Sequence, residues 1–236
     1  KRHAQGQRPA RENIADLCDA DSFIEYGPLA AAAQARRRSM EDLIANTPAD
    51  GMVTGIGAVN GAQCGEDKAR TVVMAYDATV LAGTQGARNH AKTDRMLKLA
   101  LDQQLPVVGI AAGRCFAGNA ALLGCCDAII ATRASCIAMG GPAMIEGGGL
   151  GVFKPEQIGP SAVQHANGVI DVLVENEREA VAAARHYLSF FQGRASQWTA
   201  PDQRALRSVV PENRLRVYDT RAAMAGLVDE GSLLML

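Results

Sequence analysis

The stretch best suited to chemistry is a small-residue turn, Gly113-Arg114-Cys115-Phe116-Ala117-Gly118-Asn119-Ala120, that follows an apolar run. That run, residues 105–112, is rich in Val and Ile and does not alternate polar with apolar residues, which predicts a strand buried on both faces. Ala117, Gly118 and Asn119 are expected to open a helix, and the first amides of a helix have no intrahelical partner. Small side chains let a carbonyl oxygen reach such amides, so these three residues are candidate donors to a developing oxyanion. The alternative is an ordinary strand-to-helix turn of an α/β sheet.

Other reactive side chains form no recognisable catalytic pattern. The sequence has no HExxH motif, no Ser-His-Asp set and no convincing pair of carboxylates. His90 and His165 are expected to be structural or exposed. Glu146, inside a glycine-rich loop, is the one acid considered for a role in a site.

The six cysteines show no CxxC motif and no metal-ligand spacing with the four histidines. No metal site is therefore expected. Most of the cysteines lie in apolar surroundings, which is typical of reduced thiols in a cytoplasmic protein. Cys125 and Cys126 are expected to be buried and unreactive.

Composition excludes some classes of partner. The 24 basic and 25 acidic residues leave a net charge of −1, so no broad field attracts nucleic acid or an anionic membrane. No run of about 18 apolar residues is present to span a bilayer. We therefore expect neither nucleic acid nor membrane among the partners.

The elements that must position this turn follow from hydrophobic periodicity and turn residues, and their order predicts an α/β fold. Asn60-Gly61 indicates a hairpin, and residues 140–151, with six glycines, are expected to be a long functional loop. Helices are expected over 11–18, about 18 residues from Pro28, 87–104 and 175–192, and strands over 51–59, 71–76, 127–139 and 169–174.

The domain organisation rests on one repeat and one polar stretch. Residues 14–26 align without a gap with residues 224–236, and both read as a helix end, an acidic turn with Ser and a strand start. We predict a disordered tail over 1–11, a first domain over 12–195, a linker over 196–210 and the start of a second repeat over 211–236.

Six short stretches, in this order and spacing, carry a resemblance to a known family: residues 19–25, 51–55 before the Asn60-Gly61 turn, 83–86, 117–120, 140–142 and 167–177. Residues 12–236 resemble the N-terminal half of the carboxyltransferase (beta) subunit of biotin-dependent acyl-CoA carboxylases of the acetyl-/propionyl-CoA carboxylase type. These proteins belong to the crotonase/ClpP-like superfamily. The resemblance implies a stacked β-β-α superhelix.

The resemblance also implies a function. A carboxyl group would pass from carboxybiotin to the α-carbon of an acetyl- or propionyl-type acyl-CoA. The backbone amides of Ala117, Gly118 and Asn119 would stabilise the thioester enolate. Two segments would line the acyl-CoA site, with these residues: Gly83, Thr84, Gln85 and Gly86 in one, and Gly140, Gly141 and Pro142 in the other. Biotin would be carried on a partner protein or domain, with no metal; the partners would be acyl-CoA, a biotin carboxylase/biotin carboxyl carrier subunit and further copies of the chain.

Two departures from the family are visible. The family has Gly-Gly-Ala where this chain has Gly118-Asn119-Ala120. The family also carries a further strand, an acidic glycine-rich loop and a helix before the Gly113 turn, so this chain is expected to omit a stretch near residues 106–110. Two alternatives stay open: a crotonase-type enoyl-CoA hydratase or isomerase, for which Glu146 is the candidate carboxylate, and a non-catalytic acyl-CoA-binding scaffold subunit.

Overall fold

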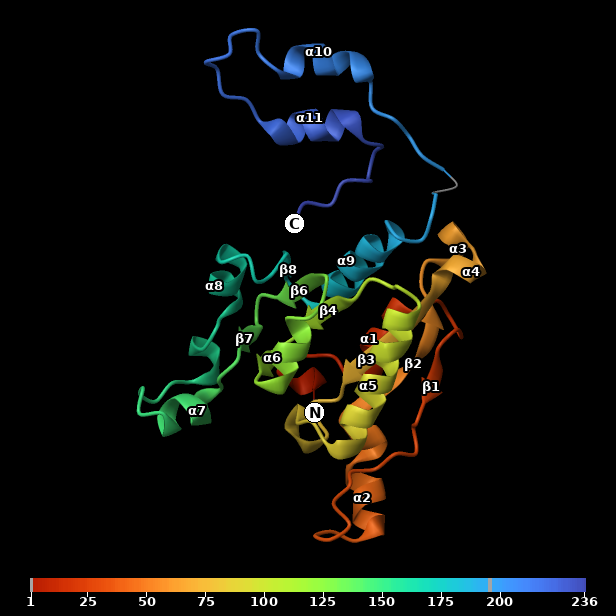
Figure 1. The fold of residues 1–236 in the computed structure, drawn as a ribbon, viewed down its shortest axis with the longest axis vertical. Helices are drawn as coiled ribbons and strands as arrows, with labels where there is room; N and C mark the ends of the chain where they lie inside the picture. Colours follow the sequence, from red (N-terminus) through yellow and green to blue (C-terminus); the bar gives the residue numbers. More distant parts are fainter. Residues whose placement is uncertain (1, 195–196) are drawn as a thin grey trace.

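The computed structural model describes residues 2–194 and 197–236 (Figure 1). Helices and strands alternate along the chain, which confirms the α/β class. The boundary predicted at residues 195–196, and Lys1 of the predicted tail, lie outside the described residues.

The first sheet is antiparallel, in the order β1-β2-β3, with β1 at Ile24–Tyr26, β2 at Met52–Ala58 and β3 at Arg70–Tyr76. Its strands pair closely because β2 carries glycine at position 55, where an added Cβ would lie 2.2 Å from the carbonyl oxygen of Ile24. Helix α1 (Ala10–Leu17) covers this sheet, and its Ile14 packs with Val53 and Val73 in a buried cluster. The prediction of β2 and β3 from the sequence is confirmed.

The second sheet is parallel, in the order β4-β6-β8, with β4 at Val108–Ala111, β6 at Ala128–Thr132 and β8 at Val172–Val174. Successive residues of β6 enter different clusters: Ile129 packs with Leu123 of α6 (Gly118–Leu123), and Ile130 with Ala180 of α9 (Glu177–Ser189). The central strand β6 is therefore buried on both faces. The same expectation for residues 105–112 is wrong, because Ile110 of β4, which pairs with β6 on one edge only, is exposed.

A third, two-stranded parallel sheet joins β5 (Arg114–Phe116) to β7 (Cys136–Ala138). The remaining helices are α2 (Met40–Asn46), α3 (Gly61–Cys64), α4 (Glu66–Ala69), α5 (Ala87–Asp102), α7 (Pro142–Gly147), α8 (Ser161–Ala166), α10 (Leu206–Val209) and α11 (Thr220–Leu227). Figure 1 shows α7 and α8 on the side of the molecule opposite β1, with α5 and α6 between them.

Several predicted elements are wrong in extent. The helix expected from Pro28 is instead a series of turns followed by the short helix α2. Helix α2 starts after Ser39, whose side chain caps it by accepting a hydrogen bond from the Asp42 amide (3.2 Å). The strand expected over 127–139 is two strands, β6 and β7, separated by a turn. The loop expected over 140–151 contains helix α7. The Asn60-Gly61 connection is antiparallel as predicted, but it holds α3 and α4 instead of a tight two-residue turn.

The expectation of a buried Cys125 is also wrong. Cys125 is exposed and Cys126 is half-buried. Helix α6 ends at Leu123, so Cys125 lies in the turn after it and is no longer held against the parallel sheet.

A single strand precedes the Gly113 turn. β4 ends at Ala111, and only Ala112 and Gly113, the latter with a φ of 115°, separate it from β5. The chain thus passes from the parallel sheet to the two-stranded sheet in two residues.

Part of the predicted tail makes specific contacts. The backbone N–H of Arg8 donates to Glu177 of α9 (3.2 Å), and the Arg8 guanidinium donates to Glu12 (2.8 Å) and Asp16 (2.6 Å). These contacts hold the start of α1 against α9.

The two repeat copies share a turn. Ser22 Oγ donates to the Asp19 carbonyl at 2.7 Å, and Ser232 Oγ donates to the Asp229 carbonyl at 2.7 Å. The residue before each serine has a positive φ, 58° at Asp21 and 76° at Gly231. The predicted strand start is wrong for the second copy, because residues 234–236, which align with β1, form no strand.

Candidate active site

The start of α6 offers free backbone donors. Ala117 precedes the helix with φ 53° and ψ −124°, and its own amide donates to the Ala138 carbonyl of β7 (3.2 Å). The amides of Gly118 and Asn119 have no hydrogen-bond partner within the part of the chain described. Of the three predicted donors, Gly118 and Asn119 are therefore the two available to a ligand oxygen.

The 83–86 segment lies directly against these donors. The Asn119 side chain accepts from Gln85 Nε2 (3.0 Å) through Oδ1 and donates to the Gly83 carbonyl (3.1 Å) through Nδ2. Gln85 Nε2 also donates to the Tyr76 hydroxyl of β3 (3.1 Å). Two segments that the sequence placed in one site are thus joined by side-chain hydrogen bonds.

The 83–86 segment is also held in place at its end, because Gly86 is joined directly to α5. Gly86 is the N-cap of α5, and a Cβ there would lie 2.6 Å from Asp50 Oδ2. Asp50 Oδ2 accepts the Asn89 amide in the first turn of the helix (2.8 Å). The cap side chain that Gly86 lacks is therefore supplied from a distant part of the chain. Thr84, by contrast, is exposed, and its hydroxyl donates to the Leu81 carbonyl (2.7 Å).

Residues 140–142 approach from the opposite side through the pairing of β5 with β7. Phe116 is in register with Ala138, and a Cβ on Gly141 would lie 3.6 Å from the Phe116 ring. Pro142 is the first residue of α7. All three predicted segments therefore lie around the start of α6.

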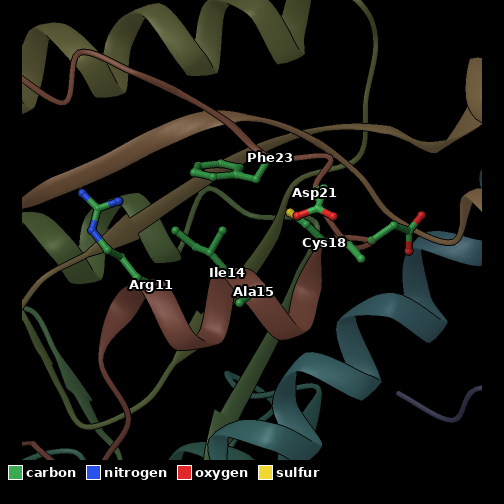
Figure 2. A pocket seen from close by; sticks show the side chains of 8 residues that line it. Arg11, Ile14, Ala15, Cys18, Asp21 and Phe23 are labelled. Carbon is green, nitrogen blue, oxygen red and sulfur yellow. The ribbon is translucent and has the colours of Figure 1, made fainter.

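A cavity of about 570 Å³ lies near Ala82 and the turn that leads into β5, and none of the candidate site residues lines it. Its wall contains Arg2 and Gln7 near the N-terminus, Ala78, Thr79 and Ala82 before Gly83, and the turn between β4 and β5. Ala134, Cys136 and Glu156 complete the lining, and Glu156 is paired with Arg114 (2.6 Å). A smaller cavity of about 370 Å³ lies elsewhere, between α1 and the segment after it, with Ile14, Cys18 and Phe23 in its wall (Figure 2). Arg11 in that wall is paired with Glu25, and the wall contains none of the candidate site residues.

Two titratable groups near the start of α6, Tyr76 and Cys115, have raised pKa values. Burial raises the pKa of the Tyr76 hydroxyl and raises the pKa of the Cys115 thiol to about 11. Glu146 is exposed on α7, and His165 Nδ1 lies 3.0 Å from the Ile170 carbonyl in a structural contact. Within the described residues no group of three or more His, Cys, Asp or Glu side chains could hold a metal ion. Among the described residues the arrangement therefore offers backbone donors and small residues, and no His, Asp or Glu side chain is hydrogen-bonded to Gln85 or Asn119.

Sequence reasoning missed Tyr76 and Asp50. Asp50 is 39 residues from Asn89, and Tyr76 was assigned only to a strand. No local signal marks either residue, since both contacts depend on how α5 packs on the first sheet. No described helix is long and apolar enough to cross a membrane.

Comparisons with known proteins agree with this geometry. A model of the carboxyl transferase domain family matches residues 1–113 and 98–235. The chain is similar to a solved single-chain, multi-domain long-chain acyl-CoA carboxylase, with 54% identity, a TM-score of 0.93 and coverage of 99% of this chain and 27% of that chain. This likeness confirms the predicted crotonase-type fold.

Two curated relatives are similar over nearly the whole chain. The methylmalonyl-CoA carboxyltransferase 12S subunit of Propionibacterium freudenreichii is 28% identical over 274 residues, covering 99% of this chain and 52% of the relative. The biotin-dependent 3-methylcrotonyl-coenzyme A carboxylase beta1 subunit of Mycobacterium tuberculosis is 26% identical, covering 97% and 50%. The chain thus spans about half the length of the curated relatives it matches.

This chain and the Propionibacterium relative differ in length within the aligned region. The aligned stretch of 274 residues is longer than this chain of 236, so the relative carries residues there that this chain lacks. The two family-model matches meet within residues 98–113, where a strand, loop and helix of the family were expected to be absent. With the family model matching both parts, the chain belongs to the carboxyl transferase domain family.

Proposed function

We propose that this chain forms the acyl-CoA-binding half of a biotin-dependent acyl-CoA carboxyltransferase. The observation that carries the proposal is the pair of free amides at Gly118 and Asn119, with the 83–86 and 140–142 segments gathered around them. Membership of the carboxyl transferase domain family supports it.

The chemistry follows from what those amides can do. When the α-proton of an acyl-CoA leaves, negative charge develops on the thioester oxygen and requires preorganised donors. The amides of Gly118 and Asn119 would donate to that oxygen, while Gly83, Gly140 and Gly141 leave room for the thioester to approach. Biotin, carried on a partner protein or domain, supplies the carboxyl group when bound. Among the described residues no His, Asp or Glu side chain is hydrogen-bonded to Gln85 or Asn119, which is consistent with proton removal by a group outside them.

The substrate proposal is an acyl-CoA, with chain length to be measured. The resemblance indicates acetyl- or propionyl-type substrates, whereas the relative at 54% identity is a long-chain acyl-CoA carboxylase. A series of acyl-CoAs from two to sixteen carbons, assayed for carboxylated product, decides between them. We further propose a cytoplasmic homo-oligomer that works with a biotin carboxylase or biotin carboxyl carrier subunit.

The domain proposal retains the predicted divisions. Residues 12–195 form the first unit, 196–210 a linker, and 211–236 begin a second repeat. Support comes from the Asp19–Ser22 and Asp229–Ser232 turns, which share the same hydrogen bond.

Asn119→Pro tests the proposed function. Proline removes the amide of the second helical residue, a position in the first turn where proline is tolerated. Loss of one oxyanion donor typically lowers the rate on the order of 10²–10³-fold. We therefore expect carboxyl transfer from carboxybiotin to fall by this factor in the full-length protein, with helical content retained.

Arg178→Pro is the matched control. Arg178 is also the second residue of a helix, α9, and is exposed. It should retain transfer. Wild-type turnover in Asn119→Pro, or equal loss in the control, would contradict the role of this amide.

A further inference from the structure

The side-chain carboxamides of Gln85 and Asn119 are hydrogen-bonded to each other at the proposed site. We call these two residues the Gln85–Asn119 pair. Gln85 Nε2 has two protons, one given to Asn119 Oδ1 (3.0 Å) and one to the Tyr76 hydroxyl (3.1 Å). Asn119 Nδ2 donates to the Gly83 carbonyl (3.1 Å). The pair thus connects β3, the 83–86 segment and the first turn of α6.

The orientation of Gln85 places its oxygen against Gly118, the residue that opens α6. With Nε2 engaged twice, Oε1 points to Gly118, where an added Cβ would lie 2.7 Å from Oε1 and 3.1 Å from Cδ. Oε1 accepts no hydrogen bond within the described residues. Glycine at position 118 is therefore what allows the carboxamide to lie beside the free amides.

From this geometry we infer that the Gln85–Asn119 pair is a positioning device for the proposed reaction, fixing the separation between the 83–86 segment and the start of α6. The inference rests on the proposed function. Both residues act through the backbone: Asn119 orients the helix start that carries the donors, and Gln85 holds the acyl-CoA segment beside it. The pair depends on this chain's Gly118-Asn119-Ala120, because the Gly-Gly-Ala of the resembled family has no side chain at position 119 to take part.

Tyr76 on β3 is the titratable group that contacts Gln85. Burial raises the pKa of Tyr76, and the Cys115 thiol of β5, a neighbour of Tyr76, also has a pKa raised by burial. The Asp50 carboxylate lies beside Gly86 with Oδ2 bound to the Asn89 amide. A carboxyl group placed at position 85 would thus have two neutral neighbours and one carboxylate.

Asn119→Gly separates the side chain from the amide. The variant keeps the backbone N–H and loses both side-chain hydrogen bonds of Asn119. A misplacement of about 1 Å costs on the order of 10²-fold in rate, so we expect kcat for carboxyl transfer to fall roughly 10- to 100-fold in the full-length protein. An unchanged kcat and KM would overturn the inference.

Gln85→Glu supplies a readout that a purely structural role would not move. At neutral pH the new carboxylate cannot donate to Asn119 Oδ1 and lies beside the developing oxyanion, so transfer should be lost. When protonated, its O–H can donate in place of Nε2, so the ratio of variant to wild-type activity should rise as pH falls. Gln103→Glu, on an exposed glutamine just after α5, is the matched control and should keep a flat ratio.

The two proposals fail in different ways. Absence of carboxyl transfer in the wild-type protein would refute the proposed function. Transfer in the wild type together with a flat ratio for Gln85→Glu would refute the positioning role alone. The pH dependence of the Gln85→Glu to wild-type activity ratio tests the positioning role even if the Asn119→Gly variant does not fold.

Discussion

At the scale of single residues, the backbone at the site adopts conformations that side chains disfavour. Ala117 has φ 53° and ψ −124°, and Leu81 and Ala82, just before the 83–86 segment, have φ of 47° and 55°. Each such residue costs about 1–3 kcal/mol and persists only where surrounding contacts hold it. The Ala117–Ala138 hydrogen bond and the Gln85–Asn119 pair are contacts of this kind. Residues with positive φ therefore lie next to both the 83–86 segment and the start of α6, which is consistent with a site whose donors are backbone groups.

Thiol labelling should distinguish Cys125 from its neighbour. Cys125 is exposed, whereas burial raises the pKa of Cys126 to about 11. Since the thiolate is the reactive form, a thiol reagent at pH 8 should modify Cys125 rapidly and leave Cys18, Cys115 and Cys126 largely unmodified, as mapped by peptide mass spectrometry. Rapid labelling of Cys126 would mean that α6 is not packed on the parallel sheet as described.

At the scale of elements, Asp50 connects the first sheet to α5. Ala49, Asp50 and Gly51 all have φ between 51° and 71°, which turns the chain tightly before β2 and directs the Asp50 carboxylate to the helix start. Asp50 and Asn89 are 1% and 0% exposed. Asn89 donates two hydrogen bonds to Asp50, one from its backbone amide to Oδ2 (2.8 Å) and one from Nδ2 to the Asp50 carbonyl (3.2 Å). The start of α5, and with it Gly86, is therefore set by a contact outside the helix.

Asp50→Ala should destabilise the fold. The change leaves the buried Asn89 amide without an acceptor, which costs about 1–3 kcal/mol in the free energy of unfolding. Urea unfolding followed by circular dichroism measures this loss. Asp67→Ala, at an exposed position in α4, is the control and should stay within about 0.5 kcal/mol of wild type. Equal stability of the two variants would show that the cap contributes nothing.

At the scale of the whole molecule, the linker prediction can be tested by proteolysis. Arg204 and Arg207 are exposed and lie within the predicted 196–210 linker, in the short helical segments before α11. Proteases cut preferentially at such exposed connections. We expect trypsin at low concentration to cleave first at Arg204 or Arg207, as identified by intact-mass analysis. A first cut inside residues 12–192 would argue against the proposed division.

The stability of the whole molecule should fall at alkaline pH. Burial raises the pKa of Cys18, Cys115 and Cys126 to about 11, against an ordinary value of 9.0. Between these values the unfolded chain releases thiol protons that the folded protein retains, so the free energy of unfolding is fully maintained below about pH 9 and decreases as pH rises towards 11. Burial lowers the pKa of Lys92, which acts in the opposite direction.

A cysteine variant isolates the thiol contribution from that of Lys92. Urea unfolding at pH 8 and pH 10 should show a smaller decrease in Cys126→Ser than in wild type. Cys125→Ser, at the exposed neighbouring position, should show the wild-type decrease. An identical decrease in all three proteins would remove Cys126 as a cause.

The sequence by itself determined the α/β class, the strands β2 and β3 and the helix α5, and with the family resemblance it named the three small-residue segments of the proposed site. These features are local: glycine and short polar residues set turn geometry, and hydrophobic periodicity sets helices and buried strands. The family resemblance rested on the same local stretches, and the family match confirms it. The helix predicted from Pro28 failed because an alanine- and arginine-rich composition does not reveal that Ser39 begins a separate helix.

Only the tertiary structure decided which donors are free and how the segments meet. The Ala117 amide is engaged because β5 pairs in parallel with β7, a contact between residues far apart in the chain. Likewise, Asn119 reaches Gln85 across 34 residues and Asp50 reaches Asn89 across 39. Hydrogen bonds of this kind depend on how α5, α6 and the sheets pack together, and that packing is a collective result of burying apolar surface which no single stretch of sequence records.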